Sequence, residues 1–387
     1  MKEIYLDNAA TTAVRSEVID AMQPFLAEIY GNPSSLHTAG QKSKRILEQS
    51  RDEVASILQA EPNEIFFTSG GTESDNLAIK GFAFANSDHG KHLITSSIEH
   101  HAVLNVFQEL EKQGFQVTYL PVDHYGLVDP EIVKNAICSD TIMISIMLAN
   151  NEIGTIEPLK EITALAGERG IAVHTDAVQA VGKIPVSVTD LGVDLLSLTA
   201  HKFYGPKGVG VLYKRYGIKL APLFEGGRQE RILRPGTENI PGVAGLATAL
   251  RLAARELDSE TASLSTMRNR LEDGIISRIR HVTLNGHPHK RLPNISSLNF
   301  AFLEGEALLL VLDTKGIAVS TASACSAGSD EPSHVLQAIG LDPVASRGTL
   351  RFSLGRNNTP EEIEYTIDAV AETLEQLRQL SPMRETG

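Results

Sequence analysis

The stretch that decides the fold runs from Leu195 to Gly210, Leu-Leu-Ser-Leu-Thr-Ala-His-Lys-Phe-Tyr-Gly-Pro-Lys-Gly-Val-Gly. Its apolar beginning predicts a buried strand, Gly205-Pro206 predicts a break, and Gly208–Tyr213 predicts a further strand. Lys202 follows the first strand beside His201, so its amine is held near the protein interior. A partly desolvated lysine can lose its proton near neutral pH and attack a carbonyl carbon. Taken alone, Lys202 is more commonly interpreted as a surface lysine at the end of a strand. The rest of the chain must therefore decide between a surface lysine and a catalytic one.

Short apolar runs alternate with amphipathic helical stretches through the first half of the chain. The runs are Glu64–Ser69, His92–Ser97, Gln116–Pro121, Thr141–Leu148, Ile171–Thr175, Leu195–Ala200 and Gly208–Tyr213. Continuous apolar strands that alternate with helices indicate a largely parallel sheet that is covered on both faces. The sequence therefore predicts one large α/β domain with about seven strands.

The alternation ends near Ala244. Helical patterns at Ala244–Leu257 and Leu264–Ile279 are separated by a predicted break around Ser259, and short strands and helices then lead to a final amphipathic helix at Pro360–Leu380. We interpret this part as a smaller α+β domain. The predicted bounds are residues 16–255 for the large domain, and residues 1–15 with 256–387 for the small one.

Composition excludes several classes of protein. Of the 387 residues, 42% are hydrophobic and 21% are charged, as in an ordinary globular protein. The net charge of -13 argues against nucleic acid or an anionic membrane as a direct partner, because both need a basic face. The start of the chain lacks a signal-peptide core, and no apolar run approaches membrane-spanning length. The two cysteines, Cys138 and Cys325, lack a metal-binding spacing. We expect a cytoplasmic protein with no intrinsic metal.

Polar residues follow several of the predicted strands, where ligands of parallel sheets collect. Gly71-Thr72 opens a helix after a strand, which suits a phosphate group. His100 and Asn151 follow two other strands, and Asp176 ends a β-branched strand. Each has an ordinary alternative: a βα turn with a threonine cap, a polar loop histidine, an asparagine turn, and an aspartate paired with an arginine.

Taken together, these residues match what a protein supplies to pyridoxal 5′-phosphate (PLP). The phosphate needs a helix start, the ring needs a stacking partner such as His100, and the protonated ring nitrogen needs an anion such as Asp176. Lys202 completes the set, because PLP enzymes bind the cofactor as an imine. The ordered set therefore predicts a PLP enzyme, although no single member does.

The chain resembles the cysteine desulfurases of the NifS/IscS type, which belong to the PLP-dependent class V aminotransferase family. The shared motifs are Tyr-Leu-Asp-Asn-Ala-Ala-Thr-Thr (5–12), Gly-Asn-Pro-Ser-Ser-Leu-His (31–37), Thr-Ser-Gly-Gly-Thr-Glu-Ser-Asp-Asn (68–76), Glu-His-His-Ala-Val (99–103), Asn-Asn-Glu-Ile-Gly (150–154), His-Thr-Asp-Ala-Val-Gln (174–179), His-Lys-Phe-Tyr-Gly-Pro-Lys-Gly (201–208) and Ala-Cys-Ser-Ala-Gly (324–328). The resemblance implies fold type I, the aspartate-aminotransferase fold, with a mostly parallel seven-stranded sheet.

The resemblance also implies roles for individual residues. They are Lys202 as the catalytic Schiff-base lysine, Asp176 on the pyridine nitrogen, Gln179 on the ring hydroxyl, His100 as a catalytic residue stacked on the ring, Asn151 beside cofactor and substrate, Gly71, Thr72, Thr199 and His201 at the phosphate, Thr237 at the phosphate of the partner subunit, and Arg351 on the substrate carboxylate. Gly71 departs from the alanine that is common in relatives.

Cys325 indicates which reaction of a PLP enzyme we expect. It lies in a small-residue, polar loop at about 321–332, where a thiolate can attack the sulfur of bound cysteine and leave alanine and a persulfide. The implied activity is that of a cysteine desulfurase that acts as a homodimer. Its acceptor would be an Fe–S scaffold or a thiolation protein, and Cys325 could transiently ligate a transferred cluster.

Other interpretations remain open at this point. A selenocysteine lyase, an aminotransferase or a kynureninase-like hydrolase would share the fold, and the same pocket would hold cysteine or selenocysteine. An aminotransferase would have no use for Cys325. A sulfur-trafficking protein or Fe–S scaffold without catalysis would need several thiolate ligands, and one loop cysteine is too few.

Overall fold

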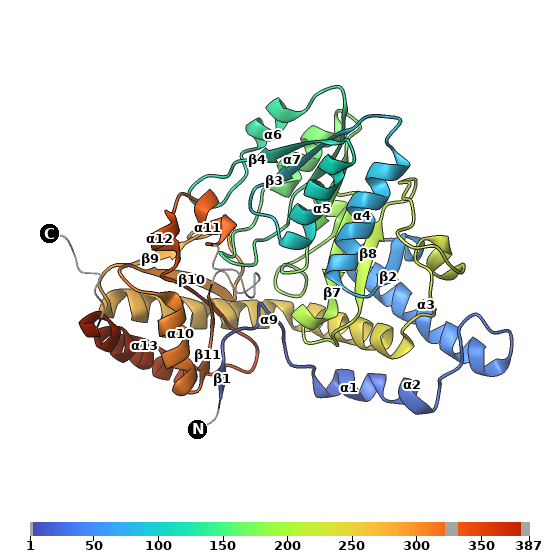
Figure 1. Ribbon diagram of the computed structural model, residues 1–387. Helices are drawn as coiled ribbons and strands as arrows, with labels where there is room; N and C mark the ends of the chain where they lie inside the picture. The colour runs from blue at the N-terminus through green and yellow to red at the C-terminus, as the bar shows by residue number, and fades with distance from the viewer. Residues whose placement is uncertain (1–2, 322–331, 381–387) are drawn as a thin grey trace.

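The computed structural model describes residues 3–321 and 332–380 (Figure 1). A seven-stranded sheet has the order β2-β8-β7-β6-β5-β3-β4. Its strands are β2 (Ile65–Thr68), β3 (His92–Ser96), β4 (Gln116–Leu120), β5 (Thr141–Ser145), β6 (Ala172–Asp176), β7 (Leu195–Thr199) and β8 (Gly210–Lys214). Strand β8 runs antiparallel to both of its neighbours, β2 and β7, and every other pair of neighbours in this sheet is parallel. The predicted mostly parallel, seven-stranded sheet is confirmed.

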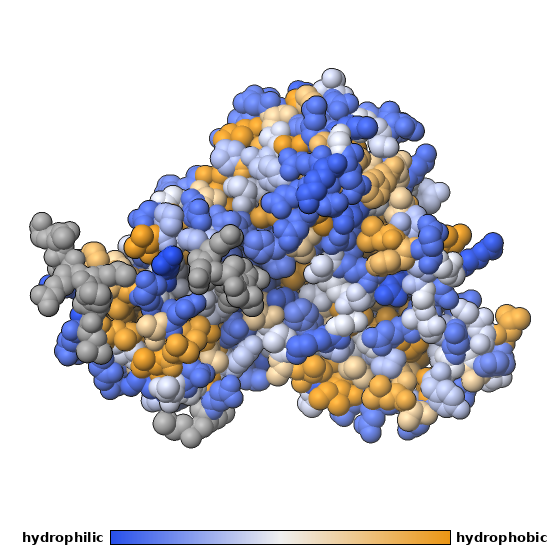
Figure 2. Space-filling view, viewed as in Figure 1, coloured by the Kyte–Doolittle hydropathy of each residue, from blue (hydrophilic) through white to orange (hydrophobic). Residues whose placement is uncertain are grey.

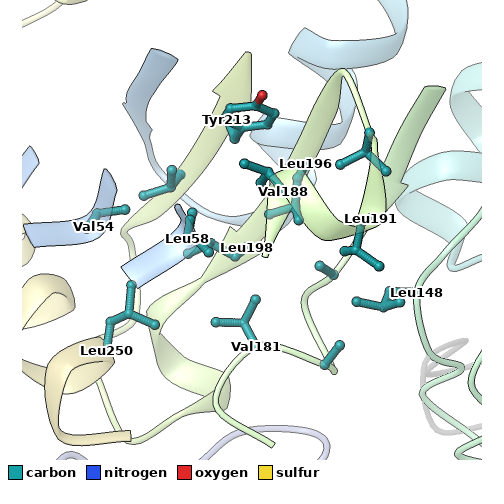
Figure 3. Close-up of a cluster of buried hydrophobic side chains, with 14 of the residues drawn as sticks. Val54, Leu58, Leu148, Val181, Val188, Leu191, Leu196, Leu198, Tyr213 and Leu250 are labelled. Carbon is teal, nitrogen blue, oxygen red and sulfur yellow. The ribbon is translucent and has the colours of Figure 1, made fainter. Parts of the chain in front are cut away.

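Helices cover both faces of this sheet, as the continuous apolar strands predict. In β7, Leu196 and Leu198 pack against Leu58 of α3 (Thr38–Leu58) and Leu250 of α9 (Ile240–Arg278) (Figure 3). Leu195 belongs to the core on the opposite face, with α4 (Gly71–Ala85) and α5 (His101–Lys112). Every side chain of β7 is therefore buried, because alternate residues enter two different cores.

The remaining helices and turns complete this part of the molecule. They are α1 (Ser16–Met22), α2 (Pro24–Ala27), η1 (Pro62–Glu64), α6 (Pro130–Ala136), α7 (Leu159–Gly167), α8 (Val188–Leu191), η2 (Ala200–Lys202) and η3 (Gln229–Ile232). None of the helices formed by residues 3–321 and 332–380 has the length and apolar character needed to span a membrane.

A second sheet, of four strands, has the order β12-β13-β10-β9 and its own hydrophobic core. Its elements and their neighbours are β1 (Ile4–Tyr5), β9 (Val282–Asn285), β10 (Ile295–Phe300), α10 (Gly305–Thr314), β11 (Ile317–Ala318), β12 (Ser320–Thr321), α11 (His334–Ala338), α12 (Pro343–Ser346), β13 (Thr349–Ser353) and α13 (Pro360–Leu380). The N-terminal strand β1 pairs in parallel with β11 beside this sheet.

The predicted helix break at Ser259 is wrong, because α9 is continuous over 39 residues. The hydroxyl of Ser259 donates to the carbonyl of Glu256 at 2.9 Å, one turn back in the same helix. The hydroxyl of Thr261 donates to the carbonyl of Lys183 at 2.9 Å. These polar side chains are therefore satisfied without a turn. The predicted domain boundary between residues 255 and 256 falls inside this helix.

Candidate active site

A cavity of about 240 Å³ opens at the carboxyl ends of β5, β6 and β7, beside the first turns of α4 and α5. It is lined by Gly71, Thr72, Asp75, His100, Ala102, Met147, Ala149, Asn151, Asp176, Val178, Gln179, Thr199, His201 and Lys202. The structure thus brings together every predicted cofactor residue except Thr237, which is exposed. Asp75, Ala102, Met147, Ala149 and Val178 were not predicted.

Lys202 ends the single turn η2 that follows β7, and its amine is fixed by the N-terminal segment. Its Nζ atom donates to the carbonyl oxygens of Ala9 at 2.6 Å and Ala10 at 2.8 Å. The amide of Gln179 also donates to Ala9, at 3.0 Å. The sequence marked residues 5–12 as a family motif but gave them no role. The structure shows that their carbonyl groups hold the predicted catalytic lysine.

Asp176 is a buried carboxyl at the end of β6, with only 6% of its surface exposed. The backbone N–H of Val178 donates to Oδ1 at 2.8 Å. Burial raises the pKa of Asp176 to about 6, and the charge of Lys202 acts in the opposite direction. A carboxylate in this position is stabilised by a cation inside the cavity, which fits the protonated ring nitrogen of PLP.

The start of α4 suits the phosphate group of PLP. Its N-cap residue is Gly70, and no side chain caps the helix, so its first N–H groups remain for an anion. The Thr199 hydroxyl donates to the carbonyl of Val209 at 3.1 Å, and Nδ1 of His201 lies 3.1 Å from the Thr11 hydroxyl. Burial lowers the pKa of His201 to about 4, so this ring is neutral at pH 7.

Although the family resemblance implies that alanine is common at position 71, we expect Gly71→Ala in this chain to weaken PLP binding about tenfold, because overpacking of this kind costs about 1–3 kcal/mol. A Cβ atom at Gly71 would lie 2.8 Å from Cγ2 of Val178, which lines the cavity. Titration of the apoprotein with PLP measures the dissociation constant. Adding Val178→Ala to Gly71→Ala should return this constant to the wild-type value. Equal affinities of the wild type and Gly71→Ala would show that Val178 moves aside freely.

His100 is held as a neutral ring at the N-terminus of α5. Its Nδ1 atom accepts a hydrogen bond from the backbone N–H of Ala102 at 3.1 Å. Burial, together with the charge of Lys202, lowers the pKa of His100 to about 4. With Nδ1 occupied as an acceptor, the proton of the neutral ring lies on Nε2. The ring can therefore face a flat cofactor without adding a positive charge.

Arg351 lies just outside the cavity residues and is tied to one of them. From β13, its guanidinium donates to the carbonyl of Asn151 at 2.8 Å and to Oδ1 of Asp7 at 2.9 Å. Its buried Nε atom has no hydrogen-bond partner among the residues that the structure describes. This orphaned donor, on a fixed guanidinium, fits a carboxylate that approaches from the cavity.

Cys325 lies outside the described residues, but the chain on both sides of it is placed. Ser320 of β12 is paired with Arg351 of β13. On the other side, the Ser333 hydroxyl donates to Oε2 of buried Glu152 at 2.5 Å, and Nε2 of His334 lies 2.9 Å from the carbonyl oxygen of Glu99. The chain on both sides of Cys325 therefore contacts residues that are hydrogen-bonded to, or adjacent in sequence to, the cavity residues Asn151 and His100.

Comparison with known proteins identifies the class. The family model described as aminotransferase class-V matches residues 4–366, so this chain belongs to the class V aminotransferase family. A protein of Methanosarcina thermophila named cysteine desulfurase IscS is 54% identical over 382 residues, which cover 99% of this chain and 94% of that protein.

Solved structures agree with this similarity. A NifS-like protein superimposes with a TM-score of 0.92 at 40% identity, covering 97% of this chain and 100% of the other. A structure described as SspA in complex with cysteine superimposes with a TM-score of 0.81 at 39% identity, covering 91% and 98%. The fold is therefore fold type I. The family's cofactor is PLP, and the buried Asp176 and the uncapped start of α4 fit it.

Among residues 3–321 and 332–380, no three histidine, cysteine, aspartate or glutamate side chains are grouped so that they could hold a metal ion.

Proposed function

We propose that the protein is a PLP-dependent cysteine desulfurase that converts L-cysteine to L-alanine and carries the sulfur as a persulfide on Cys325. The observation that carries this proposal is the cavity that joins Lys202, Asp176 and His100 beside Arg351. The SspA structure with bound cysteine supports the substrate, because that protein is 39% identical to this chain.

Each residue of the cavity has a distinct task in this proposal. When bound, PLP supplies an electron-accepting ring that stabilises negative charge on the carbon atoms of the substrate. Asp176 keeps the ring nitrogen protonated, and Arg351 holds the substrate carboxylate. Lys202, whose Nζ atom lies between two backbone carbonyls, moves the proton at the α-carbon. Neutral His100 stacks on the ring, with its Nδ1 atom held by the backbone N–H of Ala102.

The sulfur transfer balances without an outside oxidant or reductant. The Cys325 thiolate attacks the sulfur of the substrate, so an S–S bond forms and the C–S bond breaks. The electron pair of the C–S bond stays with the carbon, which takes up a proton and becomes the methyl group of alanine. Cysteine and one thiol thus give alanine and one persulfide.

Mass spectrometry tests this function directly. After incubation with L-cysteine, we expect a gain of one sulfur (roughly 32 Da) on Cys325, together with alanine in solution. Selenocysteine offered in competition measures the preference between the two substrates. No adduct and no alanine from a protein that holds its cofactor would contradict the proposal and would favour amino-group transfer.

We also propose that the protein is a homodimer, in which Thr237 reaches the phosphate of the partner subunit. Large apolar side chains are exposed near the N-terminal helices: Leu26 of α2 is 68% exposed, and Tyr30 and Leu36 are 79% and 94% exposed. Figure 2 shows hydrophobic surface over the region that holds α1 and α2. Apolar surface of this kind is typical of an interface. Light scattering should give twice the mass of the chain, and an active monomer would contradict the proposal.

The name IscS of the similar protein supports an acceptor in Fe–S cluster assembly. We propose a protein acceptor, either an Fe–S scaffold or a thiolation protein, in the cytoplasm. The acidic composition, with a net charge of -13, disfavours direct contact with nucleic acid or with an anionic membrane. Incubation of the persulfide form with a candidate acceptor should move labelled sulfur from Cys325 to the acceptor's thiol.

For Arg351→Lys we expect the KM for L-cysteine to rise roughly 10- to 100-fold, with a smaller change in kcat. Lysine cannot form the forked pair of hydrogen bonds with a carboxylate, and hydrogen bonds to charged groups are worth about 1.5–3 kcal/mol. Initial rates of alanine formation measure both constants. Arg356→Lys is the matched control, because Arg356 pairs with Glu256 outside the cavity. An unchanged KM in Arg351→Lys would remove Arg351 from the substrate site.

A further inference from the structure

A second buried carboxyl, Asp75, lies near Asp176 and faces a buried histidine. Asp75 projects from α4, lines the cofactor cavity and is 1% exposed. Its Oδ1 atom lies 3.6 Å from Nε2 of His174, a fully buried residue of β6, and has no hydrogen-bond partner among the described residues. Neither Asp75 nor His174 holds the cofactor or the substrate in the proposed function.

The charges around Asp75 favour an additional proton. The charged groups that act on Asp75 are the carboxyls of Asp176 and Glu99, whereas the charge of Lys202 acts on Asp176. Two neighbouring buried carboxylates that face one ring cation would leave one negative charge uncompensated, which is strongly unfavourable. Burial, followed by the charge of Asp176, raises the pKa of Asp75 well above its usual value. Burial also raises the pKa of Glu99 to about 8.

The imidazole of His174 is buried beside Asp75 and is held by two hydroxyl groups. Its Nδ1 atom lies 2.8 Å from the Ser145 hydroxyl, and its Nε2 atom lies 3.1 Å from the Ser197 hydroxyl. A hydroxyl can donate or accept a hydrogen bond. The neutral ring therefore keeps one orientation beside Asp75.

We propose that Asp75 keeps its proton beside the neutral ring of His174 and that the two form a neutral positioning pair, which leaves Asp176 as the anion that faces the ring nitrogen of PLP. Burial lowers the pKa of His174 to about 3, so the proton of the pair lies on Asp75. Loss of that proton would place a second anion beside Asp176 and increase the negative charge behind the ring. This inference rests on the proposed role of Asp176.

Asp75→Asn tests the pair in the cofactor-free protein, because asparagine has the same shape and no carboxyl proton. At pH 7 and above, the unfolded chain has an ionised Asp75 and a neutral His174, whereas the folded pair keeps a proton. Because the folded pKa of Asp75 is raised, the resulting stability is complete below the unfolded pKa and is lost as the pH rises.

We therefore expect the folding equilibrium constant of the wild type to fall, relative to Asp75→Asn, by up to about tenfold per pH unit as the pH rises above the ordinary aspartate pKa of 3.8. Thermal midpoints of both apoproteins from acid to alkaline pH measure the effect, and parallel curves would overturn the retained proton. If Asp75→Asn does not fold, Ser197→Ala replaces it. The Ser197 hydroxyl lowers the pKa of Asp75, so its loss should move the pH-dependent decline to higher pH, and an unmoved decline would overturn the pair.

Glu157→Gln is the matched control. Glu157 is a buried carboxyl whose pKa is raised to about 8 by burial, and it lines a different pocket, beside Pro130 and Ile132. Glu157→Gln should change the pH dependence of stability and leave the absorbance of bound PLP unchanged at every pH, whereas Asp75→Asn should change the pH dependence of that absorbance.

Asp176→Asn separates the proposal for Asp75 from the proposed role of Asp176. Undiminished PLP affinity in Asp176→Asn would contradict the role of Asp176, whatever the apoprotein curves of Asp75→Asn show.

Discussion

Cys325→Ala should abolish persulfide formation and sulfide release while the protein keeps its bound PLP. The substitution removes the only atom that can attack the substrate sulfur in the proposed reaction, and none of the cavity residues contributes to that step. Sulfide release should therefore fall to the rate of free PLP with L-cysteine, and the absorbance of the cofactor should match that of the wild type. A sulfide assay with an added thiol, which reduces the persulfide and releases sulfide, and an absorbance spectrum of the same sample measure both properties.

Cys138→Ala is the control for Cys325→Ala. Cys138 is the other cysteine of the chain, and its side chain is exposed. If exposure of a thiol were sufficient for it to take up sulfur from L-cysteine, Cys138 would carry sulfur as well. We expect Cys138→Ala to keep full activity and the full mass gain. Continued sulfide production by Cys325→Ala, with loss in Cys138→Ala, would move the acceptor thiol from one cysteine to the other.

Lys202→Ala should reduce alanine formation by roughly 10²- to 10⁴-fold, because a positioned acid or base contributes about that much. The amine that donates to Ala9 and Ala10 would be lost, and water can replace it as a hydrogen-bond donor but not as the group that moves the α-proton. The rate of alanine formation at saturating L-cysteine and PLP measures the effect, so that weaker cofactor binding does not contribute to it.

Lys207→Ala is the matched control, because Lys207 lies five residues further along the same motif and is exposed. It should leave the rate of alanine formation unchanged. If Lys202→Ala kept a rate near that of the wild type, Lys202 would not be the group that moves the proton.

The sequence predicts the central sheet well because its strands are continuous apolar runs that end in distinctive polar residues. The carboxyl ends of parallel strands meet at one edge, so Asp176 and Lys202 could be placed together from their positions alone. The cavity confirms that placement. The roles of these residues, the domain bounds and the position of Thr237 stay predictions.

The partners of these residues could not be predicted, because they depend on contacts across long distances in the chain. The backbone carbonyls of Ala9 and Ala10 carry no side-chain signal, although they hold Lys202 from about 190 residues away in the chain. Asp75 lies in the middle of a helical pattern, where an acidic residue is ordinarily on the surface. The break expected at Ser259 failed for a similar reason, since the hydroxyl bonds to its own helix.

Helix α9 has a consequence for how this molecule can be divided. At 1.5 Å per residue its 39 residues span roughly 58 Å. Its first half contributes Leu246 and Leu250 to the core under the seven-stranded sheet, and its second half contributes Leu264 and Leu271 to the core of the four-stranded sheet. A cut between residues 255 and 256 would sever one helix and leave an unmatched apolar face on each fragment. The two sheets are therefore connected by one continuous helix, and a fragment that ends at residue 255 would expose apolar side chains that are buried in the whole chain.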